Sequence, residues 1–245
     1  MTGYRGVIDT GIPLNASIAM AKTARRRRLL SVDKAINALS LSEEQDFSLW
    51  RNSKGKFKPC FSSKNTWAQL REAHPLVQWH KGIWFKFAMP KYAFCSWLAI
   101  KNRLSTGDRM IAWNPGINSG CIFCPASIET RDHLFFPCPF SATIWTCLAS
   151  GLLSSRFTMD WNSLTQIISY DSLAPIPMFL TRYVLQCSIH TIWRERNSRR
   201  HGELPNASSR IIQQIDKQIW NQLSTIRSSG FSKLEGSLQH WFATR

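Results

Sequence analysis

Residues 121–138 read Cys121-Ile-Phe-Cys124-Pro-Ala-Ser-Ile-Glu129-Thr-Arg-Asp-His133-Leu-Phe-Phe-Pro-Cys138. A Cys-x2-Cys pair places two sulfurs on one side of a tight turn, where both can contact one metal ion. The later histidine and cysteine add an imidazole nitrogen and a third thiolate. Three sulfurs and one nitrogen, with no carboxylate among them, suit tetrahedral zinc better than magnesium, calcium or manganese. We therefore predict one Zn²⁺ bound by Cys121, Cys124, His133 and Cys138.

The predicted zinc is structural rather than catalytic. Four protein ligands complete a tetrahedral site, so no position is left for a reactive water molecule. Two other interpretations of Cys121 and Cys124 remain open from the sequence, a pair of buried thiols or a disulfide. A redox role is disfavoured, because a thioredoxin-like Cys-x2-Cys needs a βαβ setting that is not visible here.

Further motifs flank these residues in a fixed order. Upstream lie Asp46-x3-Trp50 with Gly55-x-Phe57, Trp84-Phe85-x4-Pro90-Lys91-x2-Phe94-x2-Trp97-Leu98 and Arg103-Leu104-x-Thr106-x-Asp108-Arg109-Met110, and downstream lies Phe140-Ser141-x2-Ile144-Trp145. Residues 45–150 thereby resemble the reverse-transcriptase zinc-binding domain of plant LINE-type (non-LTR) retrotransposons. Residues 178–201 resemble the segment that often follows this domain, around Ile192-Trp193-Arg194-Glu195-Arg196-Asn197.

The resemblance implies a zinc module without its polymerase, encoded as a free-standing chain. It implies a structural role for Glu129 and an auxiliary, non-specific contact with template RNA or target DNA. Reverse transcription needs clustered aspartates that hold two metal ions, and the sequence contains no adjacent Asp-Asp pair. It also lacks a Gly-Lys-Ser/Thr phosphate loop and any recognisable nucleophile motif. We expect that the chain is not an enzyme by itself.

The charge of the chain indicates a polyanionic partner. Thirty-one Lys and Arg residues stand against 15 Asp and Glu residues, which gives a net charge of +16. Such a charge attracts nucleic acid or anionic lipid. Attraction to phosphates carries no base information, so we predict non-specific binding to the phosphate backbone of nucleic acid. A solvated basic surface without a dedicated partner is the alternative.

Two arginine clusters are the candidate phosphate contacts. They are Arg25, Arg26, Arg27 and Arg28 near the start of the chain, and Arg196, Arg199 and Arg200 at the end of a predicted helix. The first cluster also fits a nuclear-import signal or a solvated start of a helix. The second cluster lies on one helix face, as a row of phosphates would require. Positive charge at a helix C-terminus is, however, favourable without any partner.

The apolar periodicity predicts a mainly α protein with a short β-hairpin around Gly55. We expect a basic lead-in and a helix in residues 1–44, a small helical, zinc-stabilised domain in residues 45–150 and a C-terminal helical region in residues 151–245. Residues 228–245 are expected to be loose, apart from docking of Trp241-Phe242.

Two sets of side chains are expected to be buried. Trp67 and Leu70 are predicted to face inward from a helix that begins at Ser63. The four cysteines outside the zinc site read as small buried apolar residues. They are Cys60, Cys95, Cys147 and Cys187.

Residues 1–21 lack a secretory pattern, and no window of 18 apolar residues exists, so neither secretion nor membrane insertion is expected. A reducing nucleus or cytoplasm would suit the zinc cysteines. A rival function is a protein-interaction module that docks tryptophans near residues 79–87 onto a reverse transcriptase body. A decayed element remnant without function is the third interpretation.

Overall fold

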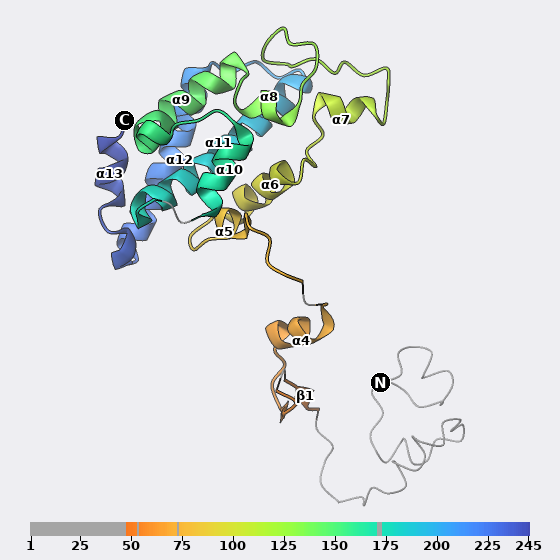
Figure 1. The fold of residues 1–245 in the computed structure, drawn as a ribbon, viewed down its shortest axis with the longest axis vertical. Helices are drawn as coiled ribbons and strands as arrows, with labels where there is room; N and C mark the ends of the chain where they lie inside the picture. Colours follow the sequence, from red (N-terminus) through yellow and green to blue (C-terminus); the bar gives the residue numbers. More distant parts are fainter. Residues whose placement is uncertain (1–47, 53, 73, 171–172) are drawn as a thin grey trace, which may run out of the picture. The chain divides into compact units, whose positions relative to one another are not determined.

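The structure is a computed structural model that describes residues 48–52, 54–72, 74–170 and 173–245. Helices dominate it, and one short antiparallel hairpin is present, so the predicted mainly α class is confirmed (Figure 1). The contacts divide the chain into two units, Met1–His74 and Pro75–Arg245. The predicted basic lead-in and helix of residues 1–44 lie outside the described residues.

The first unit contains a two-stranded hairpin. Strand β1 (Trp50–Arg51) pairs with β2 (Phe57–Lys58), and each aromatic residue lies opposite a basic one, Trp50 opposite Lys58 and Arg51 opposite Phe57. The turn contains Gly55 at φ +77°, a conformation that glycine adopts without steric cost. The prediction of a hairpin around Gly55 is therefore confirmed.

Helix α4 (Ser63–Leu70) follows the hairpin and begins at a capping serine. The Ser62 hydroxyl accepts a hydrogen bond from the backbone N–H of Asn65 at 3.3 Å. The prediction that Trp67 and Leu70 face inward is wrong, because these side chains are 66% and 78% exposed. No residue of α4 is buried, since the described part of this unit offers no core that could cover them.

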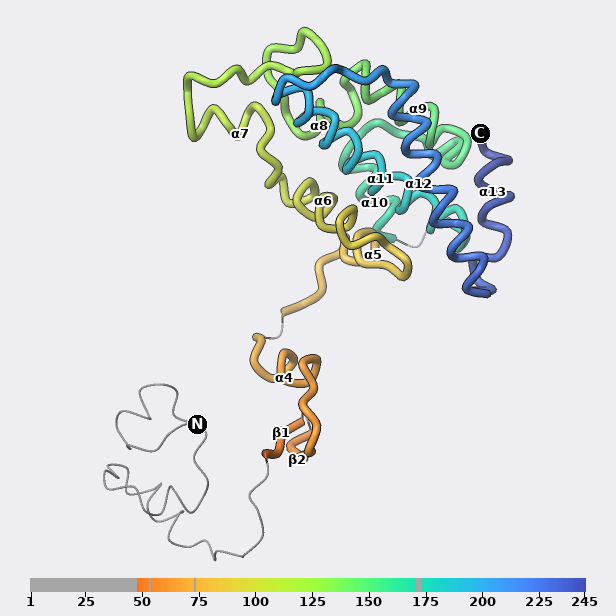
Figure 2. The backbone as a smooth tube through the Cα atoms, turned by 180° about the vertical axis from the view of Figure 1, so that it is seen from behind, coloured from red at the N-terminus to blue at the C-terminus, as the bar shows by residue number. Residues whose placement is uncertain are grey.

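The second unit is built around the long helix α11 (Pro175–Arg200). The other elements in chain order are α5 (His80–Ile83), α6 (Pro90–Ile100), α7 (Gly107–Ile111), α8 (Arg131–Phe135), α9 (Pro139–Leu153), η1 (Ser154–Arg156), α10 (Trp161–Ser169), α12 (Ser208–Ser228), η2 (Ser232–Leu234) and α13 (Ser237–Ala243). Helix α11 packs against α6, α9 and α12, as Figure 2 shows from behind. The zinc-binding motif is therefore attached to a helical bundle.

One hydrophobic core runs through this second unit. Helix α12 contributes Ile211, Ile215, Ile219 and Leu223, which recur every four residues and are all buried. They belong to the same cluster as the buried face of α9, including Trp145. The predicted boundary at residue 150 therefore does not separate two cores, because α9 crosses it and packs against both α11 and α12.

The chain end is ordered rather than loose. Residues 237–243 form α13, and Trp241 is fully buried, with its indole N–H donating to the carboxylate of Asp216 at 2.9 Å. Docking of Trp241 is thus confirmed, whereas Phe242 is 57% exposed. A helix as short as α13 carries no long apolar stripe, so periodicity does not indicate it.

The four cysteines outside the zinc motif divide into two pairs. Cys95 and Cys187 are buried, as predicted, and Cys60 and Cys147 are exposed, contrary to prediction. Cys147 lies on the solvent side of α9, because the same helix turns Trp145 and its neighbours towards the core.

Candidate metal centre

The first two candidate ligands lie on a closed loop. The backbone N–H of Cys121 donates to the carbonyl of Ala126 at 3.0 Å, and the N–H of Glu129 donates to the carbonyl of Ser119 at 2.8 Å. These bonds join the two sides of the turn that contains Cys124. The Cys-x2-Cys motif therefore forms the tight knuckle that its spacing predicts.

The other two candidate ligands come from helix starts. Thr130 caps α8, and its hydroxyl accepts a hydrogen bond from the backbone N–H of His133 at 3.1 Å. Cys138 immediately precedes Pro139, the first residue of α9, and its own N–H donates to the carbonyl of His133 at 2.9 Å. This bond fixes the spacing between the imidazole and the third sulfur.

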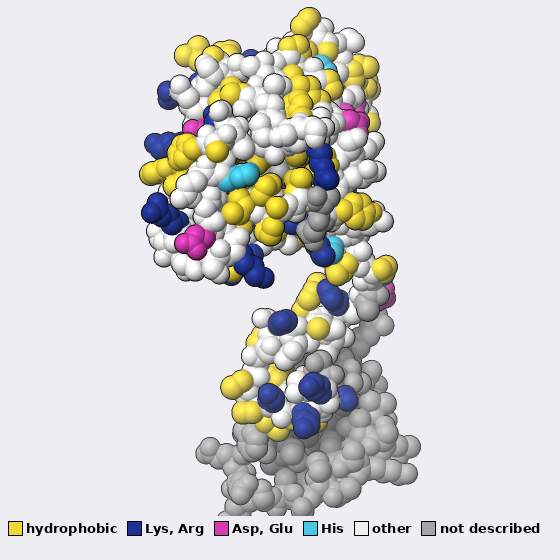
Figure 3. All heavy atoms as spheres, turned by 60° about the vertical axis from the view of Figure 1, so that its left-hand side comes forward, with side chains coloured by type: hydrophobic (Ala, Val, Ile, Leu, Met, Phe, Trp, Pro, Cys, Tyr) yellow, Lys and Arg dark blue, Asp and Glu magenta, His cyan; other side chains and the backbone are white. Residues whose placement is uncertain are grey.

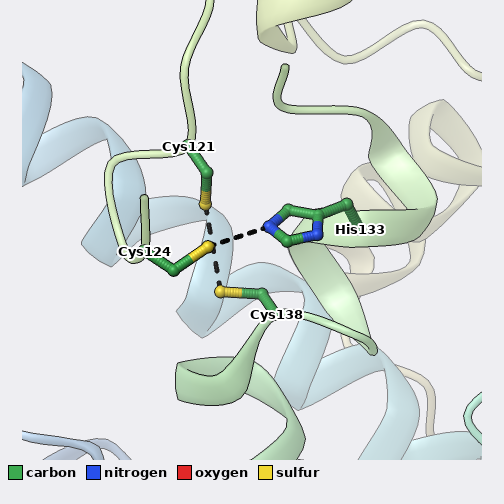
Figure 4. Close-up of side chains that lie close together, drawn as sticks. All are labelled: Cys121, Cys124, His133 and Cys138. Atoms are coloured by element: carbon green, nitrogen blue, oxygen red, sulfur yellow. Dashed lines mark hydrogen bonds between the residues drawn. The ribbon is translucent and has the colours of Figure 1, made fainter. Parts of the chain in front are cut away.

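The four side chains converge on one point, as Figure 4 shows. Their ligand atoms all lie within 4.8 Å of one another, with 3.9 Å between the sulfurs of Cys121 and Cys138 and 3.2 Å between the sulfur of Cys124 and Nε2 of His133. Two sulfurs bound to a tetrahedral zinc at about 2.3 Å are separated by about 3.8 Å. The donor set and its spacing therefore fit one structural zinc ion.

The alternative of a disulfide is excluded for this cluster. Cys121, Cys124 and Cys138 are all free thiols. The sulfurs of Cys121 and Cys138 are 3.9 Å apart, far more than a bond of about 2.05 Å. Metal binding uses the thiolate rather than the thiol. These sulfurs are therefore available as metal ligands.

The local fold prepares Cys121 to bind as a thiolate. A hydrogen bond from the sulfur of Cys138 lowers the pKa of the Cys121 thiol to about 5, against the opposing effect of burial. The backbone N–H groups of Phe123 and Cys124 lower this pKa further. The contact with Cys121, together with burial, raises the pKa of Cys138. Zinc binds thiolates, so its binding at these sulfurs would release protons.

A buried ion pair lies behind the knuckle. The Glu129 side chain is fully buried, and its Oε1 accepts a hydrogen bond from Nη2 of Arg196 at 2.6 Å and from the backbone N–H of Gly107 at 3.2 Å. The Arg196 side chain is 4% exposed and also donates to the carbonyl of Ser105 at 3.0 Å. The pair joins the end of α11 to the loop that carries the candidate ligands. It gives Glu129 the structural role that the family resemblance implies.

The side chain of Arg200 binds backbone carbonyls of the same loop. Its guanidinium donates to the carbonyls of Asn118 at 3.0 Å and Gly120 at 2.9 Å, directly before Cys121. Its Nη2 also lies 3.6 Å from Oε1 of Glu129. Burial, with the neighbouring charge of Arg196, lowers the pKa of Arg200 from its ordinary value. Arg200 therefore holds the segment that leads into Cys121 against the end of α11.

Arg199 packs on two aromatic rings of the zinc module, Phe123 and Phe140. Its guanidinium carbon lies 4.8 Å and 4.6 Å from the ring centres of Phe123 and Phe140, which stack on each other. Its Nε donates to Glu195 at 2.8 Å. Burial acts to raise the pKa of Glu195, but hydrogen bonds from Arg199 and Asn206 outweigh it and lower the pKa.

These contacts correct the prediction of a phosphate row on α11. Arg196, Arg199 and Arg200 do share a helix face, but that face meets the zinc module rather than solvent. Arg196 in particular has no surface left for a phosphate. The other predicted phosphate contacts, Arg25, Arg26, Arg27 and Arg28, lie outside the described residues.

Gly107 marks the closest backbone approach at this centre. A Cβ atom at this position would lie 2.1 Å from the carbonyl oxygen of Ser119. We expect Gly107→Ala to lower the unfolding free energy by at least about 2 kcal/mol, because two backbone segments must move apart. Gly116→Ala is the control, since its Cβ would meet only a side-chain atom of Asn114 at 3.5 Å. Equal thermal unfolding of both variants would contradict the close approach.

The fold and the donor set define a helical zinc-binding module. A comparison with protein families matches residues 61–145 to a family described as zinc-binding in reverse transcriptase. This segment is therefore similar to the zinc-binding domain of reverse transcriptases, and the match covers less than half of the chain. The hairpin and the whole of α11 lie outside it. Neither the curated proteins nor the solved structures gave a significant match.

Proposed function

We propose that this chain is a non-catalytic nucleic-acid-binding protein whose zinc module derives from a reverse transcriptase of a plant LINE-type retrotransposon. The net charge of +16 is the observation that carries the proposal. Phosphate contacts by Lys and Arg supply most of the affinity in non-specific binding. The zinc module acts as a scaffold, since protein side chains supply all four ligands of one tetrahedral ion.

Basic side chains on the described surface support the proposal. Figure 3 shows Lys and Arg side chains over both units, with few acidic side chains on the same face. Exposed examples of the second unit include Lys101, Arg103 and Lys217.

Among the described helices, none has the length and the apolar character needed to cross a membrane.

The test is the salt dependence of binding. We expect the affinity for a 20-nucleotide RNA or DNA to fall by about 100-fold between about 50 and 200 mM salt, if roughly four phosphates are contacted. Fluorescence anisotropy with a labelled oligonucleotide measures this slope. A neutral osmolyte added at constant salt is the control and should leave the affinity unchanged. An affinity independent of salt would exclude the proposal.

A second candidate function is docking on a reverse transcriptase body. Exposed aromatic side chains favour it, because Trp84 is 52% and Trp113 is 64% exposed. Trp79, Phe85 and Phe87, however, are half-buried. Only part of the aromatic group predicted to meet a partner is thus available. Binding of a purified polymerase domain that is lost in Trp84→Ala and retained at high salt would favour this candidate.

A further inference from the structure

The described part of the first unit combines basic and aromatic side chains on one small scaffold. Residues 48–74 contain six basic residues and a single acidic one, Glu72. The basic residues are Arg51, Lys54, Lys56, Lys58, Lys64 and Arg71, and all of them are exposed. Large aromatic side chains are exposed beside them, including Trp50 at 45% and Phe57 at 62%. Figure 3 shows the dark blue and yellow side chains next to one another on this segment.

The hairpin–helix surface, which we define as residues 50–52, 54–58 and 61–70, holds these side chains in place. The side chain of Asn52 accepts hydrogen bonds from the backbone N–H groups of Lys54 and Lys56, at 2.9 and 3.0 Å, and so orders the turn. Gln69 of α4 donates to the carbonyl of Arg51 at 2.9 Å. The basic side chains therefore project from a folded hairpin that is joined to a helix.

A hollow on this surface brings aromatic rings and cations together. Its volume is about 230 Å³, and its lining includes Trp50, Phe61, Arg51, Lys58 and Asn65. The rings of Trp50 and Phe61 meet edge to face at 4.5 Å. Such a contact covers at most one face of one ring, so a flat aromatic group can stack on a free face.

We infer that the hairpin–helix surface binds single-stranded nucleic acid, with a base stacked beside Trp50 and the phosphates on either side bound by Arg51 and Lys58. This rests on the proposed nucleic-acid binding and assigns it to one surface. Proteins that bind single strands without sequence preference pair stacking aromatics with a basic groove. A duplex offers its phosphates to the same cations but keeps its base faces covered. RNA and single-stranded DNA share the chemistry that this surface recognises.

An acidic peptide is a poorer occupant of this hollow. It would satisfy Arg51 and Lys58, but it offers no flat ring to the exposed face of Trp50. Trp50 and Lys58 lie directly opposite each other, so a ring and a cation stand side by side on one face of the hairpin, as a base and a neighbouring phosphate require. Charge and ring exposure together therefore favour the single strand.

The test compares four variants of the full chain on three labelled oligonucleotides of equal length, single-stranded RNA, single-stranded DNA and duplex DNA. We expect Trp50→Ala to weaken binding of both single strands about tenfold, the effect of losing one base–aromatic stack, and to leave duplex binding unchanged. Trp50→Phe keeps a ring and should stay within twofold of the parent. Trp84→Ala removes a similarly exposed tryptophan of the other unit, 52% against 45% for Trp50, and should have no effect. The two single-strand arms decide between RNA, DNA or both as the ligand.

Lys58→Gln provides a measurement that does not depend on the aromatic pair. It removes one exposed charge and should reduce the slope of log affinity against log salt by about 0.7 for single strands. The surface assignment is overturned if the chain binds single strands but both Trp50→Ala and Lys58→Gln bind like the parent, or if polyglutamate of equal charge competes as well as the oligonucleotide. If the parent chain binds no nucleic acid at all, the proposed function itself fails.

Discussion

Cys138→Ser is expected to abolish zinc binding and to unfold much of residues 75–245. Cys138 stands immediately before α9, whose buried face packs against α11 and α12. A structural zinc can contribute on the order of 10 kcal/mol to folding, comparable to the whole stability of a typical domain. The alcohol cannot replace the thiolate as a ligand, so the metal is lost together with the fixed start of the helix. Metal analysis of the purified protein and thermal unfolding by circular dichroism measure both effects.

Cys147→Ser provides the matched control for this variant. Cys147 lies on the same helix, and its side chain is exposed. We expect one zinc per chain and an unchanged unfolding temperature in this variant, because it removes a thiol outside the ligand set. Treatment of the unmodified protein with a strong chelator should reproduce the effect of Cys138→Ser. A parent protein without zinc, or a Cys138→Ser variant that keeps it, would contradict the metal centre.

The metal ligands could be predicted from sequence because their spacing is local. Cys121, Cys124, His133 and Cys138 lie within 18 residues, and a knuckle followed by two helix starts can bring them together without distant partners. Thr130, which caps α8, lies within the same stretch. Local hydrogen bonds within the loop then produce the geometry that the spacing indicates.

The role of the α11 arginines could not be predicted in this way. Helical periodicity correctly places Arg196, Arg199 and Arg200 on one face, but it does not tell whether that face meets solvent or protein. The deciding partner of Arg196 is Glu129, which lies 67 residues away in the sequence. An acid near the Cys-x2-Cys motif and an arginine-rich helix end indicate an ion pair only when the fold shows that the two lie close together.

Sequence periodicity also predicts only part of which helix faces are buried. Five apolar positions of α12 repeat with helical spacing, and the structure buries all of them. Helix α4 carries Trp67 and Leu70 with a plausible stripe, yet both are exposed, because burial depends on a neighbouring surface that the pattern does not contain. Helix α13 docks by burying Trp241 in the hydrophobic cluster and by the hydrogen bond of its indole to Asp216, and no long apolar stripe in the sequence indicates this.

Glu129→Ala is expected to lower the unfolding free energy by about 3–5 kcal/mol, the cost of leaving a buried charge without its partner. Arg196 would lose its carboxylate while its side chain remains 4% exposed. At roughly 2–4 °C per kcal/mol for a chain of this size, thermal unfolding should begin about 10 °C lower. Arg194→Ala is the control, because Arg194 lies on the same helix with its side chain exposed, and substitutions at such sites usually change stability by less than about 0.5 kcal/mol.

A double-mutant cycle separates the ion pair from simple loss of packing. Arg196→Met removes the charge but keeps much of the side-chain volume, so Glu129→Gln combined with Arg196→Met should cost less than the sum of the two single changes. The zinc content should stay at one per chain in every variant under excess zinc, because none of these residues is a ligand. Additive effects would mean that Glu129 and Arg196 stabilise the fold independently. Coupling would show instead that the end of α11 and the zinc loop fold as one piece, joined through this pair.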